Sequence, residues 1–196
     1  MYTVYGKTDT RAFRVLWMLE ELGEAYDFVK TGPQSEDARA RNLLGKVPVL
    51  EVEGDSFGDS VAIMQFLADK HGRFTAPAGT VARGKQDAVT NFINDEMDAL
   101  LWMGTRHMFM LPDDQKMPEI RGPLKWEFAR SIDRLAGFLG DRPFLMGDEM
   151  TVPDILATHC GNWAFGAKYP VENEDVLAYF KRMRSREAYQ RVKALG

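Results

Sequence analysis

Residues 72–80 divide this chain into two parts whose hydrophobic patterns differ. Before this segment, the pattern changes several times between the two-residue alternation of a β-strand and the spacing of an α-helix. After it, every regular pattern is helical. The segment itself contains one proline and two glycines and keeps neither period, which is typical of a linker. The sequence therefore predicts a small α/β domain at 1–72, a linker at 73–80 and an all-helical domain at 81–196.

The first part predicts strand, helix, strand, short helix, two strands and helix, in the order βαβαββα. Residues 2–5 form the first β-rich run, and apolar residues at helical spacing then lead to Gly23. A βαβ start predicts a parallel strand pair with a right-handed crossover. The turn at 53–55 joins two adjacent strands, so we expect a hairpin and a mixed sheet.

The second part predicts helices throughout. We expect its second helix to start after Pro123. Thr151 and Asp154 have the spacing of a capping box, which predicts a folding element at the start of a later helix. We interpret Trp126 and Trp163 as core residues. The helical patterns cover residues 88–103, 124–139, 155–163, 176–183 and 187–195.

Composition excludes several classes of protein. Lys and Arg number 25 against 29 Asp and Glu, and this mildly acidic balance argues against a nucleic-acid partner. The single cysteine, Cys160, cannot form an intrachain disulfide or a zinc–cysteine cluster. No apolar run approaches the roughly 20 residues that span a bilayer. Residues 1–10 are typical of a strand rather than a signal peptide. We therefore expect a cytoplasmic protein without a metal or a membrane partner.

Lys46, Val47 and Pro48 form the first segment that suggests chemistry. Proline removes a backbone donor and fits poorly inside a strand. At a strand entry the bond before Pro48 can be cis, which exposes the N–H and C=O of the preceding residue to a ligand. Such a backbone edge can bind a peptide as an added strand. The alternative is a trans proline at a strand edge, which is the commoner isomer.

Asp59 and Ser60, before a helical pattern, form the second segment. Helix N-termini bind carboxylates through their free N–H groups. The Ser60 hydroxyl and these donors can hold a carboxylate, and Asp59 can hold an ammonium group, so together they suit the free end of an amino acid. The alternative is simple helix capping, for which both residue types are common.

The loop after the first strand, residues 6–11, is the third segment. Hydroxyl groups of Thr8 and Thr10 meet free backbone donors at the entry to a helix. Helix N-termini stabilise thiolates, so this loop is suited to an anionic sulfur. The alternative is a polar turn in which Thr10 or Asp9 caps the helix.

These segments occur in an order that is similar to a known family. The matching pieces are residues 14–23, 45–50, 59–63 and 147–154. Over nearly its whole length the chain resembles the cytosolic glutathione S-transferase family, in its bacterial type. The resemblance implies a thioredoxin-like N-terminal domain, an all-helical C-terminal domain and a cis bond before Pro48. It also implies a homodimer that uses glutathione as co-substrate, without a metal or a nucleotide.

The resemblance also implies roles in glutathione binding. The backbone of Val47, beside Pro48, would pair with the cysteinyl part of glutathione. Asp59 and Ser60 would hold the γ-glutamyl ammonium and carboxylate groups. Many members have Glu where Asp59 stands, and the shorter side chain keeps the charge with a different reach. Lys46 occupies a position where a polar side chain often helps to hold the tripeptide.

The thiol-activating residue is where this chain departs from the family pattern. Members use a Tyr at the end of the first strand, or a Ser or Cys at the start of the first helix. Neither Ser nor Cys occurs in this loop. We rank the hydroxyl of Thr10 first, that of Thr8 second and that of Tyr5 third. Asp9 also falls at this position in some alignments, but its carboxylate would repel a thiolate.

The implied activity is attack of the glutathione thiolate on a small hydrophobic electrophile, as in detoxification. Trp102, Met103, Arg106 and His107 are the candidate walls of a second-substrate pocket, although a helix rich in Met and Trp is also typical of plain core. Two alternatives stay open. One is a non-catalytic binding or regulatory protein of the same fold, which the missing Ser or Cys favours. The other is glutathione-dependent peroxide reduction, which uses the same thiolate.

Overall fold

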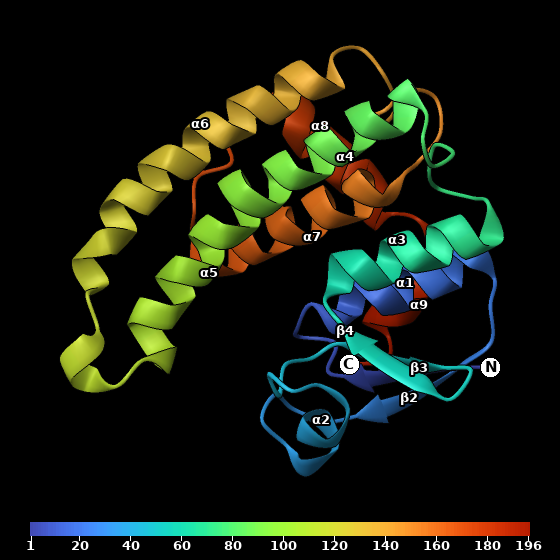
Figure 1. Cartoon of the computed structure of the whole chain (residues 1–196). Helices are drawn as coiled ribbons and strands as arrows, with labels where there is room; N and C mark the ends of the chain where they lie inside the picture. The colour runs from blue at the N-terminus through green and yellow to red at the C-terminus, as the bar shows by residue number, and fades with distance from the viewer. The chain divides into compact units, whose positions relative to one another are not determined.

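The computed structural model describes all 196 residues (Figure 1). The chain divides into two compact units. The first unit contains Met1–Ala78 together with Arg184–Gly196, and the second contains Gly79–Met183. Residues 184–196, which we expected in the helical domain, therefore belong to the unit that holds the sheet.

The first unit contains a four-stranded mixed sheet with strand order β2-β1-β3-β4. β1 and β2 are parallel, and β3 pairs antiparallel with both β1 and β4. The predicted βαβ pair and the predicted hairpin are thus both confirmed. Its elements are β1 (Tyr2–Gly6), α1 (Ala12–Leu22), β2 (Tyr26–Lys30), α2 (Glu36–Arg41), β3 (Val49–Val52), β4 (Asp55–Gly58), α3 (Ser60–His71) and α9 (Glu187–Lys193).

Helices cover the two faces of this sheet unequally. α1, α3 and α9 lie on one face and the short α2 lies near the other (Figure 1). α1 is the centre of the unit, because it packs against both α3 and α9. All eight residues from Ala12 to Leu19 are buried, including Arg14. A Cβ built on Gly6 would lie 2.4 Å from the Cβ of Ala12, so only glycine lets α1 begin this close to β1.

The second unit is helical. Its first long helix is α4 (Val81–Ile93), which continues without a break through the π-helical turn η1 (Asn94–Asp98), α5 (Ala99–Thr105) and the π-helical turn η2 (Arg106–Met110). None of the helices in the chain has both the length and the apolar character needed to cross a membrane. The remaining elements are the 3₁₀ turns η3 (Asp113–Gln115) and η4 (Pro118–Ile120), and the helices α6 (Arg121–Leu139), α7 (Val152–Ala167) and α8 (Glu174–Arg184).

Two predictions for the helical part are wrong. α6 begins at Arg121 rather than after Pro123, because proline fits within the first turn of a helix, where its missing N–H needs no partner. Trp126 is 61% exposed, and its ring lies 4.7 Å from the guanidinium carbon of Arg130. A cation over an indole stabilises the ring without burial, so Trp126 belongs to the surface of α6.

The capping box at the start of α7 is confirmed. The Asp154 carboxylate is buried and accepts the backbone N–H of Thr151 at 2.8 Å. It also accepts the hydroxyl of Tyr179 at 2.7 Å and the N–H of Leu145 at 2.9 Å. Burial raises the pKa of Asp154, while these donors act in the opposite direction. The Asp154 carboxylate therefore caps α7 and also connects it to α8 and to the loop that precedes α7.

Candidate functional site

Three segments of the first unit that adjoin its strands lie at the same end of the sheet. β1 and β3 are antiparallel with Tyr5 opposite Val49, so the loop after β1 lies beside the residues that precede β3. β3 and β4 pair with Val49 opposite Gly58, so the residues after β4 lie at that end as well. We call this the site edge. It comprises residues 7–11, 46–48 and 59–60.

The Val47–Pro48 bond at the site edge is cis, as the resemblance implies. Val47 stands before β3, and neither its N–H nor its C=O makes a hydrogen bond within the chain. The preceding turn is held by Asn42, whose side-chain amide donates to the Lys46 carbonyl at 3.0 Å and whose oxygen accepts the N–H of Leu44. A fixed turn thus presents an unpaired peptide unit, which can pair with an extended ligand.

Ser60 is the first residue of α3 and is buried, with 2% of its surface exposed. Its hydroxyl oxygen accepts a hydrogen bond from a terminal nitrogen of Arg14 at 3.1 Å. Because the oxygen is occupied as an acceptor, the Ser60 hydroxyl hydrogen is directed elsewhere and can be donated to an anion. The arrangement therefore places a hydroxyl donor and a positive charge together at the N-terminus of α3, where the helix dipole also favours an anion.

Arg14 is the functional candidate that sequence reasoning missed. It lies within the apolar run of α1 and only 1% of its surface is exposed. Charged residues are rarely buried unless they are paired, so an arginine in a run that otherwise predicts core was itself a signal. The structure shows the pairing with Ser60, which lies 46 positions further along the chain.

Asp59 caps α3 in a left-handed backbone conformation, with φ at 73°. One carboxylate oxygen, Oδ1, accepts the N–H groups of Val61 and Ala62 at 2.9 and 3.0 Å. The capping role of this residue is thus confirmed. The second oxygen, Oδ2, makes none of these bonds, so the carboxylate can accept a cationic donor while it caps the helix.

The three candidate thiol-activating hydroxyls differ in what they contact. Thr10 donates to the carbonyl of Lys7 at 2.7 Å and accepts the N–H of Ala12 at 3.2 Å, so its hydroxyl hydrogen is already committed to the turn. Thr8 is half-buried, and its hydroxyl makes no hydrogen bond. Gly196 lies close to it, because a Cβ added to Gly196 would lie 2.3 Å from the Thr8 Oγ1.

Tyr5 points to the face of the sheet opposite α1. Successive side chains of a strand alternate between faces, and Gly6 of the same strand faces Ala12 of α1. The Tyr5 hydroxyl donates to Glu51 at 3.2 Å, and the guanidinium carbon of Arg41 lies 4.1 Å from its ring centroid. Burial raises the pKa of the Tyr5 phenol. The structure therefore places this hydroxyl in an ion-pair cluster with β3 and α2, away from the N-terminus of α1.

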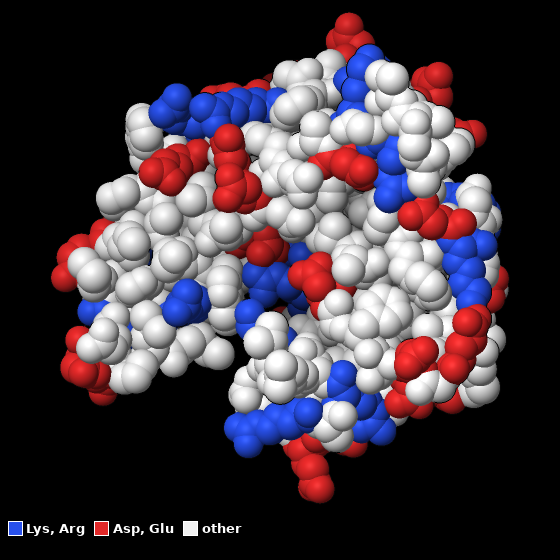
Figure 2. Space-filling model, in the orientation of Figure 1, with Lys and Arg blue, Asp and Glu red and all other residues white.

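Charge at the site edge is mixed. Lys7 and Lys46 are exposed, and Arg11 immediately precedes α1. Across the face drawn in Figure 2, basic side chains alternate with acidic ones rather than forming one patch. No group of three His, Cys, Asp or Glu side chains is placed to hold a metal ion.

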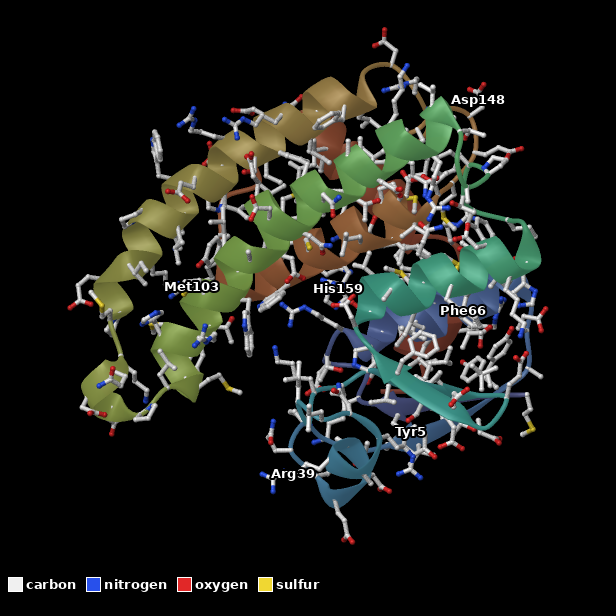
Figure 3. All side chains as sticks on the ribbon, viewed as in Figure 1. Tyr5, Arg39, Phe66, Met103, Asp148 and His159 are labelled. Atoms are coloured by element: carbon white, nitrogen blue, oxygen red, sulfur yellow. The ribbon has the colours of Figure 1, made fainter.

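The four residues expected to contact a second substrate all lie in the second unit. α5 carries Trp102 and Met103, of which Met103 is labelled in Figure 3, and η2 carries Arg106 and His107. All four side chains are half-buried. The His107 Nδ1 accepts the N–H of Met117 at 3.2 Å, which joins η2 to the following loop. A shallow hollow of about 560 Å³ in this unit is lined by α4 and η1 residues and by none of these four.

Comparison with known proteins shows what this chain is similar to. Residues 11–77 match the model for the glutathione S-transferase N-terminal domain, a range that holds most of the site edge. Glutathione S-transferase GstA of Escherichia coli O157:H7 is 29% identical over 161 residues, which are 79% of this chain and 76% of that protein. The N-terminal part of the chain is therefore similar to the N-terminal domain of glutathione S-transferases.

Solved structures of glutathione transferases have the same fold through both units. That of the enzyme from Methylococcus capsulatus str. Bath gives a TM-score of 0.84 at 22% identity and covers 98% of this chain and 97% of that one. The theta class enzyme of Xanthomonas axonopodis pv. citri, solved with glutathione bound, gives 0.78 at 22% identity and covers 97% and 95%. The N-terminal part of this chain is thus thioredoxin-like in fold and the rest is helical.

Proposed function

We propose that this chain is a glutathione S-transferase that binds glutathione at the site edge and activates its thiol for attack on small hydrophobic electrophiles. One observation carries the proposal: the unpaired backbone of Val47 and the Arg14–Ser60 pair meet the N-terminal loop of α1 at one end of the sheet. These groups match an extended tripeptide with a carboxylate at one end and a thiol in the middle.

Each part of glutathione has a partner in this proposal. The Val47 N–H and C=O pair with the cysteinyl residue, and the adjacent Pro48 shapes that edge. Ser60 donates to the γ-glutamyl carboxylate, and the free oxygen of Asp59 accepts from the ammonium group. Lys46 is exposed beside Val47 and is proposed to help hold the tripeptide.

The proposal reverses the order of the candidate hydroxyls. Thr8 has an uncommitted hydroxyl in the loop before α1, whereas that of Thr10 is donated to the Lys7 carbonyl. We therefore propose Thr8 as the donor to the thiolate, with Thr10 shaping the turn. A thiol has a pKa of about 8.5, and lowering it by about two units requires roughly 2.7 kcal/mol of preferential stabilisation of the anion. A hydroxyl donor at a helix N-terminus is suited to supply this.

Titration of bound glutathione tests the proposal. The ultraviolet absorbance of the thiolate is scanned over pH with saturating protein and compared with free glutathione. We expect the thiolate to form at lower pH when glutathione is bound. Thr8→Val should return the titration toward that of free glutathione while leaving its affinity within about twofold, and Thr10→Val serves as the matched control. No shift at saturation would refute thiol activation.

A second candidate function is glutathione binding without catalysis. The committed hydroxyl of Thr10 and the lack of Ser or Cys in the loop favour it. Ser60→Ala should weaken glutathione binding under both hypotheses, whereas only the catalytic one predicts a lowered thiol pKa. Peroxide reduction would use the same thiolate, and turnover with an organic peroxide in place of an electrophile distinguishes it.

The electrophile is proposed to contact Trp102, Met103, Arg106 and His107. Trp102→Ala should then raise the KM for an apolar electrophile and leave the affinity for glutathione unchanged. A homodimer in the cytoplasm also remains part of the proposal, and sedimentation of the purified protein tests its oligomeric state. Equal KM values for the wild type and the Trp102 variant would remove these residues from the site.

A further inference from the structure

Residues 194–196 lie against the loop that carries Thr8. α9 precedes them and is held firmly on α1. The Tyr189 ring packs at 5.0 Å from that of Phe13 and 5.1 Å from that of Trp17. Arg186 donates two hydrogen bonds to Glu21, at 2.6 and 2.8 Å. α9 therefore fixes the position at which the segment 194–196 begins.

Residues 194–196 cross to the end of the sheet where β1 and β2 terminate. The Lys30 ammonium, at the end of β2, donates to the Leu195 carbonyl at 2.7 Å. A Cβ built on Gly196 would lie 2.3 Å from the Thr8 Oγ1 and 3.1 Å from the Thr8 Cβ. Gly196 thus lies in direct contact with Thr8 and covers one side of its hydroxyl.

This tail is held more weakly than α9. Tyr189 and Val192 of α9 are buried, whereas residues 194–196 are all exposed. Beyond the end of α9, the Lys30 bond is the contact that joins Leu195 to the sheet, and it is itself exposed to solvent. An exposed hydrogen bond adds little net stability, so the tail can open while α9 stays docked.

We infer that residues 194–196 act as a strap that closes over Thr8 and competes with the thiol of glutathione. This inference rests on the proposed function, because it takes Thr8 as the group that meets the thiol. Glutathione then binds only to the open form, so its apparent affinity equals its intrinsic affinity multiplied by the fraction of molecules that are open. One charge-assisted hydrogen bond at the surface is expected to bias closure by about 3- to 10-fold.

Removing the anchor of the strap is the first test. Lys30→Met deletes the donor to Leu195, and Lys193→Met, an exposed lysine of α9, is the matched control. Calorimetric titration with S-methylglutathione should give a dissociation constant about 3- to 10-fold lower for the Lys30 variant. The control should match the wild type. An unchanged or higher dissociation constant for Lys30→Met would overturn the strap.

Locking the strap is the second test. The Cβ separation of 3.1 Å at Thr8 and Gly196 is close to the roughly 3.5–4.5 Å that a disulfide spans, so Thr8→Cys with Gly196→Cys should cross-link on oxidation. Cys160 is buried and does not compete. The oxidised protein should bind S-methylglutathione at least tenfold more weakly than the same protein after phosphine reduction.

The outcomes separate the two proposals. Failure of the cysteines to cross-link, or equal affinity of the oxidised and reduced forms, would overturn the strap and leave glutathione binding intact. Failure of the wild-type protein to bind S-methylglutathione at any concentration would instead overturn the proposed function, and the strap with it.

Discussion

Replacing Arg14 with methionine should weaken glutathione binding without unfolding the protein. The guanidinium lies 3.1 Å from the Ser60 Oγ, and a carboxylate bound to that hydroxyl would lie about 5–6 Å from the charge. At an effective dielectric constant of about 20, two unit charges at this distance attract by roughly 3 kcal/mol. Partial screening leaves about 1.5–3 kcal/mol, which corresponds to a roughly 10- to 100-fold rise in the dissociation constant.

The effect on stability should be separable from the effect on binding. Arg14 is 1% exposed and donates to Ser60, and removing one partner of a buried hydrogen bond costs about 1–3 kcal/mol. We therefore expect the free energy of unfolding of Arg14→Met to fall by about 1–3 kcal/mol while the protein stays folded. If Arg14 had only a structural role, the folded fraction of the variant would bind glutathione as tightly as the wild type does.

Calorimetric titration with glutathione and thermal unfolding of the same preparations provide the assay. Arg130→Met is the matched control, because Arg130 is an exposed arginine of the second unit that stacks on Trp126. A dissociation constant for Arg14→Met within twofold of the wild type would refute the reasoning. So would a loss of affinity that disappears after correction for the unfolded fraction.

Three further predictions concern the fold. Asp154→Asn should lower the melting temperature by about 5–15 °C, because an amide cannot accept from all the donors around this carboxylate. Gly104→Ala should lower the free energy of unfolding by about 1–3 kcal/mol, because its Cβ would lie 2.1 Å from the Tyr169 hydroxyl. Chemical denaturation of the double variant with Tyr169→Phe should show that most of this stability is recovered. Burial and the hydrogen bond to Glu20 raise the pKa of Tyr26, so the folded state holds the phenol proton more tightly than the unfolded state, and the stability that this contributes below pH 10 is lost as the pH rises. Chemical denaturation at several pH values should show a smaller loss of unfolding free energy at high pH for Tyr26→Phe.

The order of elements could be predicted from sequence because it depends on local periodicity. The alternation before 72 and the helical spacing after 80 led to the βαβαββα order, the parallel pair and the hairpin. The capping box was predictable for the same reason, since its two partners are three residues apart. Trp126 was not, because an aromatic residue at helical spacing has the same pattern whether it faces the core or stacks on a neighbouring arginine.

The residues of the candidate site also differ in whether the sequence alone could predict them. Local pattern was enough to single out Asp59 and Ser60, which are polar residues before a helical segment, and Val47, which precedes a proline at a strand entry. Arg14 escaped notice because its neighbours in α1 are apolar, and its partner lies 46 positions away. The choice between Thr8 and Thr10 depends on the folded loop, since both are threonines in one segment and differ only in what their hydroxyls contact.

Local sequence set which segments form strands, helices and turns, because these depend on residues a few positions apart. Packing set which distant residues meet: Arg14 with Ser60, the tail after α9 with Thr8, and Tyr5 with Glu51 rather than with α1. Hydrogen bonds act over about 3 Å, so their partners depend on how the sheet and helices come together, and local pattern carries no record of that.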